Sequence, residues 1–316
     1  MNQFYIVLMA VLPVFSIIGA GIFMRKVNWL TEEADKSLMR ITINVLAPAL
    51  IFDSILHNDA LKNISNVVVA PLVGFGTAAM GMGIALALRK FITHDKRILA
   101  TFAVCVGVYN YGYIPVPLVN SLFDRTTLGV LFVHNLGVEI CIWTLGLMVL
   151  GANSNERGWR QLINAPVIAI IASLAVNFLG LERLIPAFAL STAKMLGQCS
   201  IPMGLILVGA TMADHMHEFH SAQGWRIIAW GCFIRLGLAP ILFMVLAKFL
   251  PCSVELKRVI IIQGAMPAAT FPIVMAKHYN GDPPTALRVL LATSVLGLIT
   301  IPLWIRFGIK FVFPEL

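Results

Sequence analysis

Long apolar stretches fill almost the whole chain, and they constrain its fold more than any other feature. A helix needs about 20 apolar residues to cross the hydrocarbon core of a bilayer. Charged residues make up only 12% of the sequence, against about 25% in a soluble domain. The chain is therefore predicted to be an all-α integral membrane protein. The ten predicted membrane-spanning helices lie near residues 4–24, 38–57, 66–88, 98–122, 126–150, 164–181, 188–212, 225–250, 256–278 and 285–310.

Prolines occur inside several of these stretches. A proline lacks a backbone donor and clashes with the carbonyl one turn earlier. Inside a bilayer it is therefore tolerated only where protein or a water-lined cavity satisfies the freed groups. Transporters bind their substrates at broken helices of this kind. Helix breaks are expected at Pro48, Pro115 and Pro117 in the first half of the chain and at Pro202, Pro267 and Pro272 in the second.

The two halves of the chain share a spacing of prolines and glycines. Four pairs recur 153 to 157 residues apart: Pro13 and Pro166, Pro48 and Pro202, Gly107 and Gly264, and Pro115 and Pro272. With five predicted spans on each side, this spacing favours two inverted five-helix repeats, over residues 1–151 and 152–316. In that arrangement the broken fourth span crosses the broken ninth span near the middle of the bilayer.

Polar side chains are concentrated at the two expected breaks. Where a helix stops and restarts, free N–H groups and the positive end of the helix dipole favour an anionic group such as a carboxylate. The predicted substrate-binding residues are Tyr109, Asn110, Tyr111, Gly112 and Tyr113 in span four, Gln263 and Thr270 in span nine, and Asn44 and Ser200 near Pro48 and Pro202. The alternative for each is structural, as a capped kink or as ordinary helix packing.

The ionisable residues inside the predicted spans include Asp53, Glu139 and Arg235. Such residues are costly in a bilayer, so a functional role is the default hypothesis. In one interpretation Glu139 or Asp53 takes up a proton and couples transport to the proton gradient. In another, which we prefer, Glu139 forms a structural pair with Arg235. Direct contact with the substrate is the third interpretation.

Other functional classes lack their sequence signals. Neither H-E-x-x-H nor G-x-S-x-G occurs, so no enzyme activity is predicted. No cofactor is expected apart from coupling to H⁺ or Na⁺, and no obvious cluster of sodium ligands lies near the breaks. The histidine-containing loop at residues 214–220 is expected to be a solvated loop rather than a metal site.

The basic residues indicate orientation rather than a nucleic-acid partner. The net charge is +8, but the Lys and Arg residues fall in short loops and not on one folded face. Loops after the odd-numbered spans carry more of them than loops on the opposite side, although Lys257 and Arg258 argue the other way. Because basic loops stay in the cytoplasm, both termini are predicted to lie outside.

Four segments carry a family resemblance: Thr42–Phe52, Ser200–Ala210, Met266–Ala269 and Ser294–Trp304. Together they resemble the auxin efflux carrier family, which includes plant auxin exporters and bacterial carriers for compounds such as malonate. The resemblance implies ten helices in a fold shared in outline with bile-acid sodium symporters. It also implies a scaffold of spans one, two, six and seven, an elevator-like transport unit of spans three to five and eight to ten, and homodimerisation through the scaffold.

The resemblance further implies a carboxylate site beside an asparagine at the span-four break, and Asn110 is the best match. The plant proteins have an asparagine-proline-rich break, whereas here Tyr-Asn-Tyr-Gly-Tyr precedes the prolines. We therefore expect a secondary transporter of a small organic anion, auxin-like or malonate-like, in the bacterial inner membrane. The alternatives are a sodium- or proton-coupled symporter of another organic solute, a membrane-embedded enzyme and a sensor.

Overall fold

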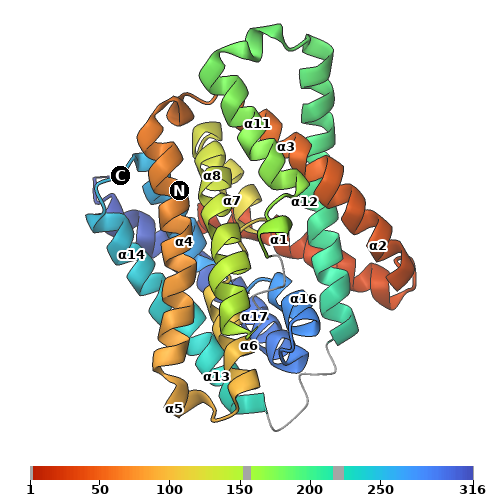
Figure 1. Ribbon diagram of the computed structural model, residues 1–316, viewed down its shortest axis with the longest axis vertical. Helices are drawn as coiled ribbons and strands as arrows, with labels where there is room; N and C mark the ends of the chain where they lie inside the picture. The colour runs from red at the N-terminus through yellow and green to blue at the C-terminus, as the bar shows by residue number, and fades with distance from the viewer. Residues whose placement is uncertain (1–2, 152–157, 216–223, 316) are drawn as a thin grey trace.

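The computed structural model describes residues 3–151, 158–215 and 224–315, and within them the chain forms helices joined by short turns (Figure 1). The first half contains α1 (Gln3–Lys26), α2 (Glu32–Ile41), the π-helix η1 (Thr42–Leu46), α3 (Ala47–Ile55), the 3₁₀-helix η2 (Asp59–Lys62), α4 (Ile64–Ala87), α5 (Arg89–Ile92), α6 (Lys96–Gly107), α7 (Pro115–Leu122), α8 (Arg125–Cys141), the π-helix η3 (Ile142–Gly146) and α9 (Leu147–Val149). The second half contains α10 (Gly158–Gln161), α11 (Ala165–Leu179), the 3₁₀-helix η4 (Leu181–Leu184), α12 (Ala187–His215), α13 (Trp225–Cys232), the π-helix η7 (Phe233–Leu238), α14 (Ala239–Phe249), α15 (Val254–Ala265), α16 (Phe271–His278) and α17 (Pro283–Val312).

Among the described residues, seven continuous helical runs are long and apolar enough to cross a membrane. They coincide with predicted spans one, two, three, five, seven, eight and ten. The sixth predicted span is the shorter apolar helix α11. The fourth and ninth each consist of two short helices, α6 with α7 and α15 with α16. An all-helical, multi-pass membrane protein is thus confirmed, while ten crossings in an inverted repeat stay a prediction.

The helix breaks predicted at Pro48 and Pro202 are wrong. α12 continues through Pro202 without interruption. Around Pro48 the chain also stays helical, because the π-helix η1 leads directly into α3 and Ala47 donates its N–H to Thr42 O, five residues back. A local π turn is one of the adjustments that let a membrane helix contain a proline.

The helices pack in two groups, which Figure 1 shows with α2 and α12 on one side and α4 and α14 on the other. We call α1, α2, α3, α11 and α12 the smaller group, and α4, α6 to α9 and α13 to α17 the larger group. Both groups contain closely packed helix pairs: a Cβ on Gly21 of α1 would strike the Ile206 carbonyl of α12, and one on Gly74 of α4 would strike the His134 carbonyl of α8. Small residues permit such contacts between membrane helices.

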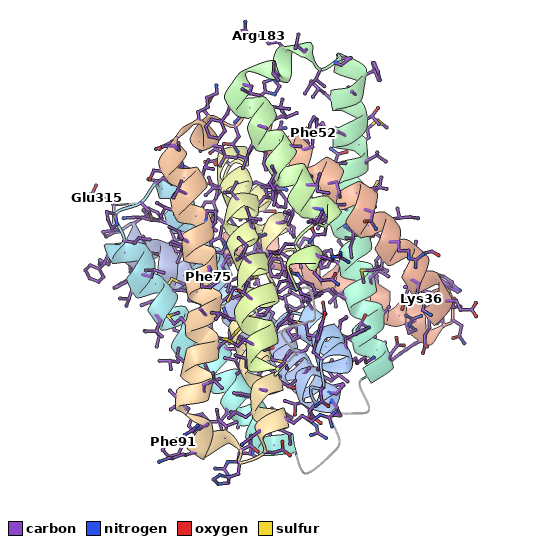
Figure 2. All side chains as sticks on the ribbon, in the orientation of Figure 1. Lys36, Phe52, Phe75, Phe91, Arg183 and Glu315 are labelled. Atoms are coloured by element: carbon purple, nitrogen blue, oxygen red, sulfur yellow. The ribbon has the colours of Figure 1, made fainter. Side chains whose placement is uncertain are left out.

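Large apolar side chains project from the outer faces of the helices (Figure 2). On α4, Ile64, Val68 and Leu72 are each more than half exposed. Their spacing of four residues places them on one face of the helix. An outward face of this composition is suited to lipid rather than to water.

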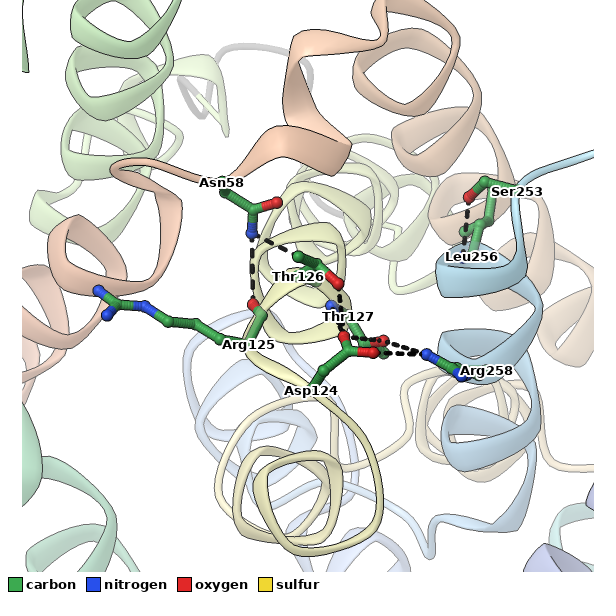
Figure 3. Close-up of polar contacts among 8 residues, drawn as sticks. All are labelled: Asn58, Asp124, Arg125, Thr126, Thr127, Ser253, Leu256 and Arg258. Atoms are coloured by element: carbon green, nitrogen blue, oxygen red, sulfur yellow. Dashed lines mark hydrogen bonds and ion pairs between the residues drawn. The ribbon is translucent and has the colours of Figure 1, made fainter.

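Polar contacts fix the start of α8 (Figure 3). Asp124 is the N-cap: its Oδ1 accepts from the backbone N–H of Thr127 at 2.8 Å, and its Oδ2 accepts from Arg258 of α15 at 2.7 Å. Burial alone would raise the pKa of Asp124, but hydrogen bonds from Thr126 and Thr127 and the charge of Arg258 lower it to about 2. The cap therefore joins the first turn of α8 to α15 through a charged contact.

Candidate substrate site at the helix interruptions

Two helices of the larger group are interrupted and not merely kinked. α6 ends at Gly107 and α7 begins at Pro115, while α15 ends at Ala265 and α16 begins at Phe271. Pro115 and Pro117 lie in the first turn of α7, Pro272 lies in the first turn of α16, and Pro267 lies in the interruption itself. A proline in the first turn removes a donor that has no helical partner in any case. Pro115, Pro117 and Pro272 are therefore compatible with the starts of the second half-helices.

The two interruptions pair with each other through their backbones. Tyr109 and Ala268 form an isolated antiparallel bridge. The N–H of Asn110 donates to Pro267 O at 2.8 Å, and the N–H of Ala269 donates to Val108 O at 3.0 Å. Backbone groups inside a bilayer have no water to bond. Each interruption therefore supplies hydrogen-bond partners for some of the backbone groups of the other.

Asn110 places free donors beside open space. Its Oδ1 accepts from the N–H of Ile114 at 3.2 Å, which identifies the remaining amide atom as the Nδ2 donor. Within the described part of the chain, no acceptor bonds to Asn110 Nδ2 or to the backbone N–H groups of Tyr111, Gly112 and Tyr113. A Cβ added to Gly112 would meet no atom within 4 Å. Successive free N–H groups of this kind suit an oxyanion.

A chain of hydrogen bonds connects the interruptions to α8. The Tyr111 hydroxyl donates to Glu139 Oε1 at 2.7 Å, and Trp143 Nε1 donates to Glu139 Oε2 at 3.1 Å. Asn135 donates from Nδ2 to Tyr111 O at 2.7 Å, while Gln263 donates from Nε2 to Asn135 Oδ1 at 3.0 Å. Side chains from α8 and α15 therefore hold the interruption at Tyr111 from two sides.

The predicted ion pair between Glu139 and Arg235 is wrong. Glu139 accepts from Tyr111 and Trp143, whereas Arg235 donates to backbone carbonyls of the α15 interruption. Arg235 is fully buried, and its Nη1 has no partner within the described part of the chain. The two charged groups lie at separate ends of the polar network, so neither neutralises the other directly.

The predicted tyrosines separate into different roles. Tyr109 is fully buried, and its hydroxyl shares a hydrogen bond of 2.9 Å with Thr77 of α4, so it packs in the core and does not line open space. Tyr113 places its ring against Gly204 of α12, where any Cβ would overlap the ring. Ser200 is buried one turn before Gly204, and Thr270 is partly exposed at the start of α16.

Two other predicted site residues lie away from the interruptions. Asn44 is exposed and donates to Arg40 O at 2.9 Å, so it does not line a pocket with Asn110. Asp53 pairs with Arg125 of α8 at 2.9 Å, beside a pocket of about 210 Å³ that residues of α3, α8 and α12 line. The Arg125 guanidinium and the Asn58 side chain thus link the end of α3 to the start of α8. The histidine residues at 217 and 220 lie outside the described residues.

Sequence reasoning missed several residues that hold the site together. Trp143 follows Glu139 by one helical turn, and this spacing is a signal that could have suggested the contact. Thr293 of α17 accepts from the N–H of Ala268 at 3.2 Å, and Thr77 contacts Tyr109. For these two threonines the sequence contains no local signal, because the contacts join helices distant in the chain.

The sequence also matches a family of known proteins. The sequence profile described as membrane transport protein matches the chain twice, over residues 6–158 and 153–305. The chain belongs to this family. It is the auxin efflux carrier family that the motifs of spans two, seven, nine and ten resemble, so that resemblance is confirmed.

Proteins with similar sequences include two that are named as uncharacterized transporters. One, from Methanothermobacter thermautotrophicus, is 23% identical over 93% of this chain and 96% of its own length. The other, YfdV from Escherichia coli K12, is 24% identical over 93% of this chain and 95% of its own length. The match therefore extends over nearly the whole of each protein, which agrees with a membrane transporter.

Proposed function

We propose that this protein is a secondary transporter of a small organic anion, an auxin-like or malonate-like carboxylate, which binds at the interruption around Asn110. The observation that carries the proposal is the set of donors on four consecutive residues, Asn110 to Tyr113, that are free within the described residues and lie beside the open space at Gly112. A carboxylate needs several donors when it leaves water. The start of α7 adds the positive end of a helix dipole.

The proposed architecture is ten membrane helices in two inverted repeats, with spans four and nine crossing at their interruptions. The double match of the family profile and the backbone pairing of the interruptions support it. In this arrangement the smaller group is the scaffold and the larger group is the transport unit. Alternating access then moves the larger group past α1, α3 and α12 by an elevator motion, with both chain termini outside the inner membrane.

We further propose that Glu139 couples transport to protons. Among the described residues Glu139 has no cationic partner, and its hydrogen-bond donor Tyr111 belongs to the same interruption as the free donors. An ionised Glu139 repels an anion bound nearby, whereas a protonated one does not. A proton and a carboxylate would then bind together, and substrate affinity would fall as pH rises.

The proposed site is tested first by ligand-induced stabilisation of the purified protein. Thermal unfolding is followed with auxin-like, malonate-like and other carboxylates. A ligand at about 100 times its dissociation constant stabilises the folded state by about 2.7 kcal/mol. The variant Asn110→Ala should bind the same carboxylate at least about tenfold more weakly, since it loses a hydrogen bond to a charged group.

Asn44→Ala is the matched control, because Asn44 is also an asparagine of the membrane region, but among the described residues its side chain bonds to Arg40 O, one turn earlier in the same helical run. It should bind the carboxylate like the wild type. If a folded Asn110→Ala protein binds the carboxylate as tightly as the wild type, the site does not include Asn110. If no carboxylate stabilises the wild type, the anion itself is the wrong substrate class.

Homodimerisation through the smaller group is also proposed. An apolar groove of about 470 Å³ runs between α3, α11 and α12 and includes Pro48, Phe52, Phe188 and Leu196. A partner that covers these side chains would remove apolar surface from contact with lipid and improve packing. Light scattering of the detergent-solubilised protein should give twice the mass of one chain, and Phe188→Glu should reduce it to the monomer.

A further inference from the structure

Arg235 occupies the carbonyl end of the interrupted helix α15. The last carbonyls of any helix lack intrahelical donors and carry the negative end of the helix dipole. Here Arg235 Nε donates to Met266 O at 2.8 Å, and Nη2 donates to Gln263 O at 3.0 Å and to Gly264 O at 3.2 Å. One side chain thus donates to three carbonyls at this helix end, and the Gln263 carbonyl also accepts from the N–H of Met266 at 3.2 Å.

The environment of this guanidinium is fully enclosed. Arg235 has no exposed surface, and its Cζ lies 4.9 Å from the ring centre of Tyr109 and 5.3 Å from that of Phe243. Both aromatic faces attract a cation. No carboxylate pairs with Arg235 within the described part of the chain. Backbone carbonyls and aromatic rings therefore stabilise this buried charge.

Carbonyls at the end of a broken membrane helix are also the ligands that bind a coupling ion such as Na⁺ in secondary transporters. A cation that entered here would have to displace the guanidinium, since two cations at this separation repel each other strongly in a low-dielectric interior. We propose that Arg235 is a resident cation that takes the place of a coupling metal ion, so that substrate binding requires no Na⁺. The inference rests on the proposed function, whose coupling it specifies.

The position of Arg235 connects this charge to the candidate site. The Gln263 carbonyl accepts from Arg235, while the Gln263 side chain donates to Asn135 and to Tyr111 O. The guanidinium therefore bonds to the backbone of Gln263, and the side chain of Gln263 belongs to the network that holds the Asn110 interruption. A permanent positive charge at this point favours a carboxylate there whatever cation the solution contains.

The experiment compares Na⁺ with choline in thermal unfolding of the purified protein, alone and with the carboxylate that binds best. The wild type should show the same unfolding temperature and the same carboxylate affinity in both salts. Arg235→Ser removes the guanidinium from the three carbonyls. The carboxylate affinity of this variant should then differ by at least about threefold between Na⁺ and choline, or its unfolding temperature should differ between the two salts. Arg235→Lys keeps a positive charge and should stay insensitive to Na⁺.

Arg226→Ser is the control, because Arg226 lies on α13 of the same predicted span and also donates to a backbone carbonyl, that of Phe91, but at the surface. It should behave like the wild type in both salts. Na⁺-dependent binding by the wild type overturns the proposal, as does a folded Arg235→Ser protein that ignores Na⁺. If Arg235→Ser does not fold, the wild-type comparison and Arg235→Lys still decide. Failure of every carboxylate in both salts would instead reject the proposed function.

Discussion

The Tyr111 hydroxyl donates to Glu139 Oε1 at 2.7 Å, and this contact ties an ionisable group of α8 to the backbone segment that holds the free donors. Trp143 contacts the second oxygen of the same carboxyl group. Among the described residues, Glu139 is therefore held in place by two neutral donors and not by an ion pair.

Glu139→Gln should remove the pH dependence of carboxylate binding while leaving the protein folded. Glutamine keeps the size of the side chain and imitates the protonated state. In the wild type we expect affinity to fall by up to about tenfold for each pH unit above the range in which Glu139 is protonated. Binding is measured between pH 5 and 8, with the exposed Glu33→Gln as control. A pH profile that survives in Glu139→Gln would assign the coupling to another group.

The contact between Asn135 and Gln263 should be measurable as a coupling energy. The two side chains join α8 to α15 across a hydrogen bond of 3.0 Å. Hydrogen bonds between membrane helices contribute about 0.6 kcal/mol on average. A double-mutant cycle of Asn135→Ala and Gln263→Ala, followed by unfolding in detergent, should give a coupling of about 0.5 to 1.5 kcal/mol. A control cycle in which Asn177→Ala on α11 takes the place of Asn135→Ala should give a coupling energy near zero.

Gly204→Ala should displace the Tyr113 ring and impair binding at the neighbouring donors. The new methyl group would overlap the ring, so either α12 or Tyr113 has to move. Overpacking of this kind costs about 1 to 3 kcal/mol. Gly83→Ala on α4 is the control, because a Cβ there meets no atom within 4 Å. Carboxylate affinity and unfolding temperature are compared, and the additional change Tyr113→Leu should restore stability. Two alanine variants with equal properties would rule out tight contact at Gly204.

Asp124→Asn should weaken the pH dependence of stability at acidic pH. The pKa of Asp124 is lowered to about 2 in the folded protein, against about 3.9 in an unfolded chain. Its charge therefore stabilises the fold above about pH 4, and this contribution is lost as the pH falls toward 2. Asparagine still caps α8 but cannot pair with Arg258, whereas Asp124→Ala also loses the cap, at about 1 kcal/mol. Unfolding temperatures at pH 6, 4 and 3 check this, and identical acid slopes in wild type and Asp124→Asn would contradict it.

The regular parts of the fold could be predicted because apolar length alone identifies a membrane helix. The interruptions near Asn110 and Pro267 could also be located, since proline and glycine cluster there. Pro48 and Pro202 gave the same signal but lie in continuous helices, because one proline removes a single donor and a π turn or neighbouring helices compensate.

Side-chain directions inside the interruptions could not be predicted. In a helix the period of 3.6 residues states which residues share a face, but residues 108–114 have no such period. The sequence consequently does not distinguish Tyr109 from Tyr111, although one contacts Thr77 in the core and the other contacts Glu139. The Glu139–Arg235 pair was wrong for a related reason, since opposite charge does not reveal that backbone carbonyls already occupy Arg235.

The backbone pairing of residues 108–110 with residues 267–269 has a consequence for how this chain can be divided. Each half contains one broken helix whose open backbone groups are satisfied by the other half. A fragment that ends near residue 151 would therefore insert into the membrane with those groups exposed to lipid. The complementary fragment would restore these partners, so the smallest unit able to hold this site contains both interruptions.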